Sequence, residues 1–181
     1  MVPTTWSGAR TFGASANLLL AVGALSAFVG AISLDAALRH GDWKDGLAIL
    51  AAALLAFAAA LALRLDISPD GVRQRFLIGS RAVAFDRIAH ARLEVIGRRG
   101  RGRFTLSLVP REDRHIRIGL RKFPVEASVA LLSELEARGI EIEIADDRAR
   151  YYAEQVIAAR IRLQAEVALA TSPPASRDSA A

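Results

Sequence analysis

The sequence predicts an α+β membrane protein, in which a two-helix transmembrane hairpin precedes a basic, β-rich domain. The first observation behind this prediction is the charge distribution. Only six charged residues of the 181-residue chain precede Arg64, whereas 21 basic and 16 acidic residues follow from there on. The second is a pair of uncharged apolar runs at residues 11–34 and 46–63. The third is the alternation of apolar and polar residues after Arg64, which is typical of strands.

The two apolar runs are long enough to be transmembrane helices. A helix over residues 11–34 has a length of roughly 36 Å, against a hydrocarbon core of about 30 Å. In residues 46–63, eight large apolar side chains contribute about −0.5 kcal/mol each to insertion, about −4 kcal/mol in all. A buried soluble helix is one alternative. A cleaved signal peptide is the other, although the first run continues past the small residues near Ala27 where cleavage is expected.

The basic residues predict the orientation of this hairpin. The connecting segment 35–45 has two basic and three acidic residues, whereas the second run is followed by Arg64, Arg73, Arg75 and Arg81. The positive-inside rule then places residues 1–10 and the domain in the cytoplasm, and residues 35–45 in the periplasm. We therefore expect an integral protein of the inner (plasma) membrane with both termini in the cytoplasm.

Small residues at four-residue spacing predict how the two helices pack. Lipid provides no hydrophobic drive for helix pairing, so close backbone contact has to supply the attraction. The first row consists of Gly23, Ala27 and Ala31, and the second of Ala48, Ala52, Ala56 and Ala60. The two rows predict either a tight hairpin or an interface with another copy. Since neither span contains a charged group, a proton relay or transport path is not expected.

About six or seven short strands are predicted after Arg64. The segment Ser68-Pro69-Asp70-Gly71 has the composition of a tight turn. Extended runs are expected at residues 63–68, 72–78, 81–85, 91–96, 104–108 and 115–120, with further turns at 79–80, 97–102 and 110–113. Strands with a turn every eight to twelve residues indicate an antiparallel sandwich or barrel.

Helical periodicity returns near the C-terminus. Residues 124–138 have apolar side chains at helical spacing, with Pro124 in the first turn and Gly139 as the C-terminal cap. A short strand is expected at 140–144, where Glu141 and Glu143 suit the edge of a sheet. A further helix is predicted for residues 146–170, and a disordered tail rich in Ser, Pro and Ala for 171–181.

The helix at 146–170 has an apolar face formed by Tyr152, Val156, Ala159, Leu163, Val167 and Ala170. This row is too short to define a coiled coil. Two interpretations remain open, namely a helix that docks a partner subunit and a helix that packs on its own domain.

The order of these elements resembles that of bacterial membrane-anchored PH-like (pleckstrin-homology-like) proteins. The matching residues are Pro69, Asp70 and Gly71 in the first turn, and the aromatic-x-x-Ile step of Phe85 and Ile88. The resemblance covers residues 12–140. It implies a cytoplasmic PH-like domain at residues 64–145, an antiparallel β-barrel or sandwich capped by a C-terminal helix. It also implies a binding or assembly module in a bacterial inner membrane. Phosphoinositide binding is not carried over, because the first turn lacks a basic residue.

The strongest charge cluster is the arginine-rich hairpin tip of residues 97–103. Residues 64–122 have 15 basic and 6 acidic side chains, and residues 123–181 have 6 basic and 10 acidic ones. The tip contributes Arg98, Arg99, Arg101 and Arg103 to the first group. It is interpreted either as a solvated turn or as a contact to anionic phospholipid headgroups, at about 1 kcal/mol for each basic residue, with a protein partner as a further possibility. Nucleic acid is disfavoured because aromatic residues for base stacking are not interleaved.

No catalytic, cofactor-binding or metal-ligating residue is predicted. Cysteine is absent from the sequence, which excludes thiolate chemistry. The three histidines, His40, His90 and His115, lie in different predicted elements, and Glu112 and Asp113 belong to a turn. Nucleotide-binding and hydrolase motifs do not occur. We therefore expect a binding module without cofactors, which acts in protein–protein interaction or self-association. Sensing of anionic lipid is the alternative, and an enzyme or transporter accessory subunit is a third reading.

Overall fold

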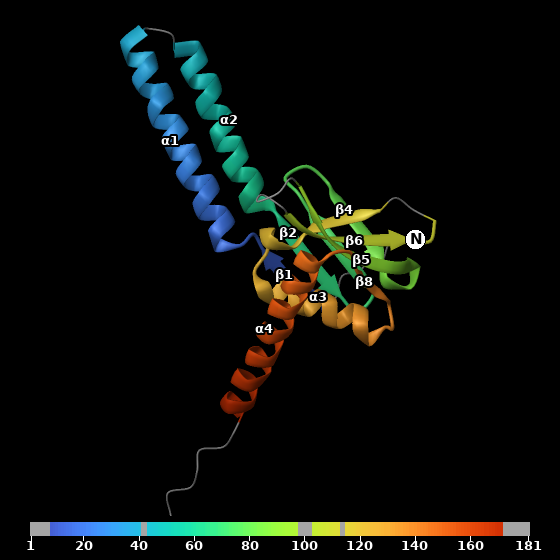
Figure 1. The fold of residues 1–181 in the computed structure, drawn as a ribbon. Helices are drawn as coiled ribbons and strands as arrows, with labels where there is room; N and C mark the ends of the chain where they lie inside the picture. Colours follow the sequence, from blue (N-terminus) through green and yellow to red (C-terminus); the bar gives the residue numbers. More distant parts are fainter. Residues whose placement is uncertain (1–7, 41–42, 98–102, 113–114, 172–181) are drawn as a thin grey trace, which may run out of the picture.

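The computed structural model describes residues 8–40, 43–97, 103–112 and 115–171, and within these residues the architecture is α+β, with two β-sheets and four α-helices (Figure 1). The elements in chain order are β1 (Arg10–Gly13), α1 (Ala16–His40), α2 (Trp43–Ala62), β2 (Arg64–Ser68), β3 (Gly71–Arg75), β4 (Ser80–Ala84), η1 (Phe85–Arg87), β5 (Ile88–Ile96), β6 (Arg103–Pro110), β7 (Ile116–Gly119), η2 (Leu120–Lys122), α3 (Val125–Ala137), β8 (Ile142–Ile144) and α4 (Asp147–Thr171).

Helices α1 and α2 form an antiparallel hairpin that projects from one end of the domain (Figure 1). Both are long and apolar enough to cross a membrane, and almost none of their side chains are buried. Helices in the core of a soluble protein would be mostly buried, so the alternative of a buried soluble helix does not fit the structure. Helix α1 continues to His40 and so includes much of the segment 35–45 that was predicted as a loop. An ion pair between Asp35 and Arg39 (2.9 Å), one helical turn apart, stabilises this extension.

Residues 10–13 form a strand, so the prediction that the first helix begins at residue 11 is wrong. Strand β1 pairs antiparallel with β2, with Arg10 opposite Ile67 and Gly13 opposite Arg64. The helix begins only after Ser15, whose hydroxyl accepts a hydrogen bond from the Leu18 N–H (3.3 Å). The partner strand of β1, β2, follows both helices in the sequence, so the local sequence pattern around residues 10–13 does not reveal this strand.

The strands form two open sheets with the orders β1-β2-β3-β4 and β7-β6-β5-β8. The sequence predicted a barrel or a sandwich. The sheets do not close into a barrel, and two separate sheets agree with the sandwich. All neighbours are antiparallel except β5 and β8, which are parallel. Strand β8 is parallel because the chain reaches it through the crossover helix α3.

The turn of residues 68–71 is as predicted. The Ser68 hydroxyl oxygen accepts hydrogen bonds from the N–H groups of Asp70 and Gly71, both at 3.2 Å. Gly71 is required by close contact, because a Cβ atom there would lie 2.4 Å from the Val83 carbonyl oxygen. Strand β3, predicted to reach Ile78, ends at Arg75 instead. The Phe76 N–H donates to the Gly79 carbonyl oxygen (3.0 Å), which makes residues 76–79 a turn.

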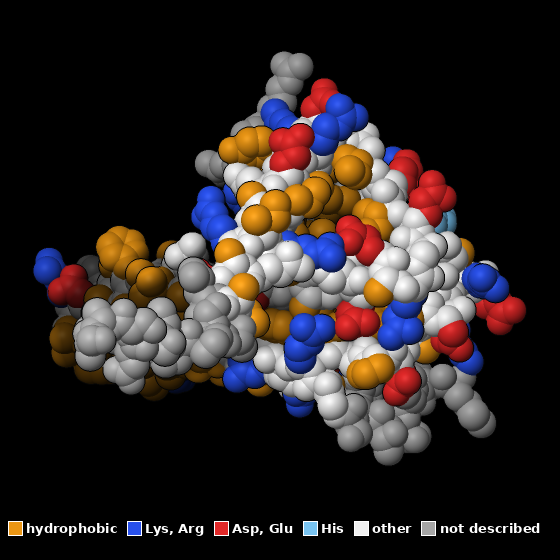
Figure 2. All heavy atoms as spheres, turned by 90° about the horizontal axis from the view of Figure 1, so that it is seen from below, with side chains coloured by type: hydrophobic (Ala, Val, Ile, Leu, Met, Phe, Trp, Pro, Cys, Tyr) orange, Lys and Arg blue, Asp and Glu red, His pale blue; other side chains and the backbone are white. Residues whose placement is uncertain are grey.

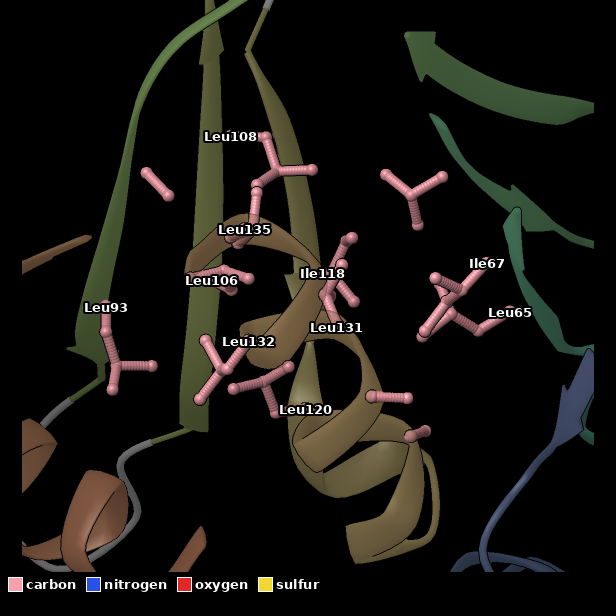
Figure 3. Packing of buried hydrophobic residues seen from close by; sticks show 14 of the residues in the cluster. Leu65, Ile67, Leu93, Leu106, Leu108, Ile118, Leu120, Leu131, Leu132 and Leu135 are labelled. Atoms are coloured by element: carbon pink, nitrogen blue, oxygen red, sulfur yellow. The ribbon is translucent and has the colours of Figure 1, made fainter. Parts of the chain in front are cut away.

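Leucine and isoleucine side chains from both sheets and from α3 form the core (Figure 3). Leu65 and Ile67 contribute from β2, and three further strands and the helix contribute Leu93, Leu106, Leu108, Ile118, Leu131, Leu132 and Leu135. The predicted amphipathic helix at 124–138 is confirmed as α3, whose buried side packs on this core.

Helix α4 begins on the domain and ends away from it. Asp146 caps the helix by accepting the Ala149 N–H (2.8 Å), and this hydrogen bond lowers the pKa of its carboxyl. Tyr152 and Val156 are buried, whereas Val167 is 63% exposed. Figure 1 shows the helix leaving the domain on the side opposite to α1 and α2. The first half of this helix therefore packs on its own domain, and the docking of a partner subunit stays a prediction.

Candidate functional site

The arginine-rich tip is only partly within the described residues. Arg98, Arg99 and Arg101 lie outside them, and Arg103 is the exposed first residue of β6. Its neighbour Phe104 lies beneath the Arg121 guanidinium, at 4.9 Å from ring centre to Cζ. Arg121 belongs to η2, which contacts the start of α1. Arg103 is therefore at the end of the domain from which the helices project.

This helix-proximal end is defined by the contacts of Ser15 and Arg64. The Ser15 N–H donates to the Lys122 carbonyl oxygen (2.7 Å), and its hydroxyl donates to that of Arg121 (3.3 Å). Arg64 follows α2 after one residue and lies over Gly13, where a Cβ atom would be 2.9 Å from its Nη1. Within the described part of the chain, the basic residues of the helix-proximal end include Arg64, Arg75, Arg81, Arg103, Arg121 and Lys122. Sequence reasoning found the arginines after α2, but it did not find that η2 joins them.

A buried carboxylate ties β1 to the rest of the sheet. Asp66 is 1% exposed. It accepts hydrogen bonds from the Thr11 hydroxyl (2.8 Å), Arg73 Nε (3.0 Å) and Arg75 Nη2 (2.9 Å). Burial alone raises the pKa of Asp66, but the hydrogen bonds from Arg75, Thr11 and Arg73 outweigh it, and the net pKa is lowered. Sequence reasoning missed this group, because Thr11 lies 55 residues from Asp66.

The structure brings one of the predicted small-residue rows to the interface between α1 and α2. A Cβ atom on Gly23 would lie 3.3 Å from the Phe57 ring. Gly23, Ala27 and Ala31 all line a groove of about 420 Å³ between the helices. On α2, however, the contacts come from Gly46, Leu50, Ala53 and Phe57.

The second row, Ala48, Ala52, Ala56 and Ala60, does not form the predicted contact with α1. Ala48, Ala52 and Ala56 are exposed and only Ala60 is partly buried, because Gly46 allows a closer approach on another face of α2. A Cβ atom on Gly46 would be 3.0 Å from the Ala37 Cβ and 3.1 Å from the Ser33 carbonyl oxygen. That the alanine row meets another copy stays a prediction.

A second surface, the α4 groove, lies between β1, α3 and α4. It has a volume of about 650 Å³, and its apolar lining includes Phe12, Val129, Leu163 and Val167. Two ion pairs border it, Arg10–Glu134 (3.2 Å) and Arg160–Glu136 (2.7 Å). Figure 2, which views the molecule from the side opposite to α1 and α2, shows acidic and basic side chains interspersed around apolar ones.

The residues behind the PH-like resemblance meet at the other end of the sheets. The Arg138 guanidinium lies over the Phe85 ring (4.7 Å) and donates to the Pro69 carbonyl oxygen. The Phe85 N–H donates to the Asp70 carbonyl oxygen (3.0 Å), and Ile88 is buried beside them. These contacts close the end of the domain, and they assign a packing role to the motif.

Few features of the described residues point to catalysis. His90 is partly exposed on β5 and His115 is exposed before β7. Among the residues with assigned positions, no group of three or more His, Asp or Glu side chains could hold a metal ion. Comparison of the chain with protein-family models, with curated protein sequences and with solved structures gives no match. The PH-like resemblance therefore stays a prediction.

Proposed function

We propose that this chain is a membrane-anchored binding module whose domain assembles with a protein partner through the α4 groove. The carrying observation is the exposure of the second half of α4. The helix continues past its buried residues, Tyr152 and Val156, and its partly buried Leu163 lines an apolar groove. A helix in isolation gains little stability from its own hydrogen bonds, and an apolar groove that is open to solvent favours a partner.

Three features support the anchoring part of this proposal. Helices α1 and α2 have the length and hydropathy of membrane spans. Their outward side chains are large and apolar, for example Leu20 at 71% and Phe28 at 64% exposed, which in water would be costly. Basic residues collect at the helix-proximal end, as the positive-inside rule requires for a cytoplasmic domain.

Site-specific photocrosslinking of the full chain in its native membrane tests the partner proposal. A photoreactive residue at Leu163 lies in the groove, and the control position is Tyr151, on the same helix but 62% exposed and outside the groove. We expect one discrete product from position 163 and none from position 151. A product of twice the chain mass identifies self-association, and another discrete mass identifies a different protein. Equal labelling from both positions, or no product, contradicts the proposal.

Contact with anionic lipid is a second candidate function, which Arg121 and Lys122 support by their position at the start of α1. Energy transfer from a label on His115→Cys to labelled lipid in nanodiscs is expected to rise when anionic lipid replaces neutral lipid. Arg121→Glu with Lys122→Glu should reduce this rise, whereas the same change at Arg148 and Arg150 on α4 should preserve it. An identical signal in the two lipids contradicts the lipid function.

A further inference from the structure

The turn between β3 and β4 has an unusual composition. Tight turns are normally built from Gly, Pro, Asn, Asp and Ser, but here the sequence is Phe76-Leu77-Ile78-Gly79. Leu77 is 42% exposed and Ile78 is 91% exposed. The exposed fraction of Ile78 is larger than that of Leu20 on the outer surface of α1, which is 71%. Phe76 packs partly against the core and holds the turn in place. Two large apolar side chains are thus held outward at a fixed position.

The strand register places this turn at the helix-proximal end. Arg75, the last residue of β3, lies opposite Arg64, which follows α2 after one residue. Because β3 is antiparallel to β2, the chain beyond Arg75 continues toward the side from which α2 arrives. Figure 1 shows α2 running into β2. At 3.3 Å per residue the apex extends up to roughly 7 Å beyond Arg75, which is about the depth of one headgroup layer.

Basic side chains surround the base of the turn. Arg75 precedes it but pairs with the Asp66 carboxylate (2.9 Å), whereas the Arg81 guanidinium lies 5.9 Å from the centre of the Phe76 ring. Arg64 lies opposite Arg75 on the neighbouring strand. Long basic side chains place their charge at the level of the headgroups while their alkyl stems cover apolar surface. An apolar apex with cations behind it matches the polarity profile of one leaflet of an anionic bilayer.

We propose that residues 76–79 insert into the leaflet that the domain faces, with Leu77 and Ile78 against the lipid acyl chains and Arg64 and Arg81 at the headgroups. This inference rests on the anchoring part of the proposed function. The turn is then a third contact with the bilayer, beside α1 and α2. A third contact outside the hairpin restricts the rotation of the domain about the hairpin, and with it the direction in which α4 projects.

Depth-dependent quenching in the full chain tests the proposal. The sequence has no cysteine, so single cysteines carry an environment-sensitive fluorophore without other changes. The variants are Ile78→Cys in the turn, Phe28→Cys in the middle of α1 and Asp70→Cys in the exposed turn at the other end of β2. The labelled chains are reconstituted in nanodiscs of phosphatidylcholine and phosphatidylglycerol containing spin-labelled lipid. Since Ile78 is almost fully exposed, the label there leaves the core undisturbed.

We expect quenching and a blue shift at positions 28 and 78, and neither at position 70. Quenching at position 28 alone overturns the insertion of the turn and leaves the anchoring intact. Lack of quenching at all three positions overturns the anchoring, and the insertion with it. Adding Arg81→Glu to the chain labelled at position 78 is expected to weaken the quenching. If it does not, the role assigned to Arg81 is wrong.

Discussion

Asp66 is a residue on which the connection between β1 and the domain depends. Strand β1 has four residues and pairs with a single neighbour, which gives few backbone hydrogen bonds. The Thr11 hydroxyl adds a side-chain hydrogen bond to the buried Asp66 carboxylate, which also neutralises Arg73 and Arg75. Removing one partner of a buried ion pair leaves uncompensated charge, which costs more than the pair itself contributes.

Asp66→Asn is therefore expected to lower the free energy of unfolding by about 2–3 kcal/mol. This is below the roughly 3–5 kcal/mol for a fully buried pair, because both arginines are partly exposed and solvent screens them. Thermal unfolding of the full chain in detergent measures the loss. The control is Asp86→Asn, which removes an exposed carboxylate and should change stability by less than about 0.5 kcal/mol. An equal effect of the two substitutions contradicts the role of Asp66.

The same carboxylate predicts a pH dependence. Its pKa is lower in the folded chain than the unfolded value of about 3.9. The unfolded state therefore binds the proton first, so the stabilisation is present above about pH 4 and is lost as the pH falls through the folded-state pKa. Unfolding of the wild type and of Asp66→Asn between neutral and acid pH should show the difference between them shrinking at acid pH. A constant difference excludes Asp66 as its source.

At the scale of elements, the side of α2 that contacts α1 depends on Gly46 and Ala53, which differ from the predicted alanine row of α2. Gly46→Leu is expected to separate the helix ends near Ala37 and Ser33, since even a Cβ atom there is at contact distance. Overpacking of this kind costs roughly 1–3 kcal/mol. Ala48→Leu is the matched control, because Ala48 is exposed on α2. The distance between α1 and α2 is measured by disulfide crosslinking of Ser26→Cys to Ala53→Cys, which lie against each other. Equal crosslinking yields in the Gly46→Leu and Ala48→Leu chains contradict the assigned interface.

The attachment of α4 depends on one of two adjacent tyrosines. Tyr152 stacks on Phe104 with 4.5 Å between ring centres, and its hydroxyl is 3.0 Å from that of Ser128. Burial raises its pKa despite this hydrogen bond. Tyr152→Ala should lower the free energy for local opening of α4 by about 3 kcal/mol, whereas Tyr151→Ala, at a 62% exposed position, should have little effect. Hydrogen exchange of α4 measures both, and similar protection in the two variants contradicts the assignment.

Elements with local patterns could be predicted, and those that depend on distant partners could not. Alternation of apolar residues located β2 and β6, and helical spacing located α3 and α4, because both signals lie within the segment itself. Strand β1 has only four residues, and their partners in β2 lie 51 to 57 positions away. Residues 76–78 were predicted as strand because they favour strands in composition, with the turn at 79–80, and only the Phe76–Gly79 hydrogen bond reveals that the reversal begins earlier. The face of α2 that contacts α1 depends on helix rotation, which alanine spacing alone does not determine.

At the scale of the whole molecule, the pairing of β1 with β2 restricts the membrane topology. The two strands flank the hairpin directly, and their backbones are hydrogen-bonded over four residue pairs. Residues before α1 and the domain after α2 must therefore lie on the same side of any membrane that the helices cross. This holds whichever side that is, so it is independent of the positive-inside argument that favours the cytoplasm.

Cysteine accessibility in oriented membrane vesicles tests this topology together with its orientation. Arg10→Cys marks β1, Asp70→Cys marks the domain and Lys44→Cys marks the start of α2 at the other end of the hairpin. In right-side-out vesicles a membrane-impermeant maleimide is expected to label only Lys44→Cys, and in inverted vesicles only the other two. Labelling of Arg10→Cys and Asp70→Cys from opposite sides contradicts the β1–β2 pairing. Labelling of all three from one side means that the hairpin does not cross the membrane, and the reversed pattern keeps the pairing but places the domain outside the cytoplasm.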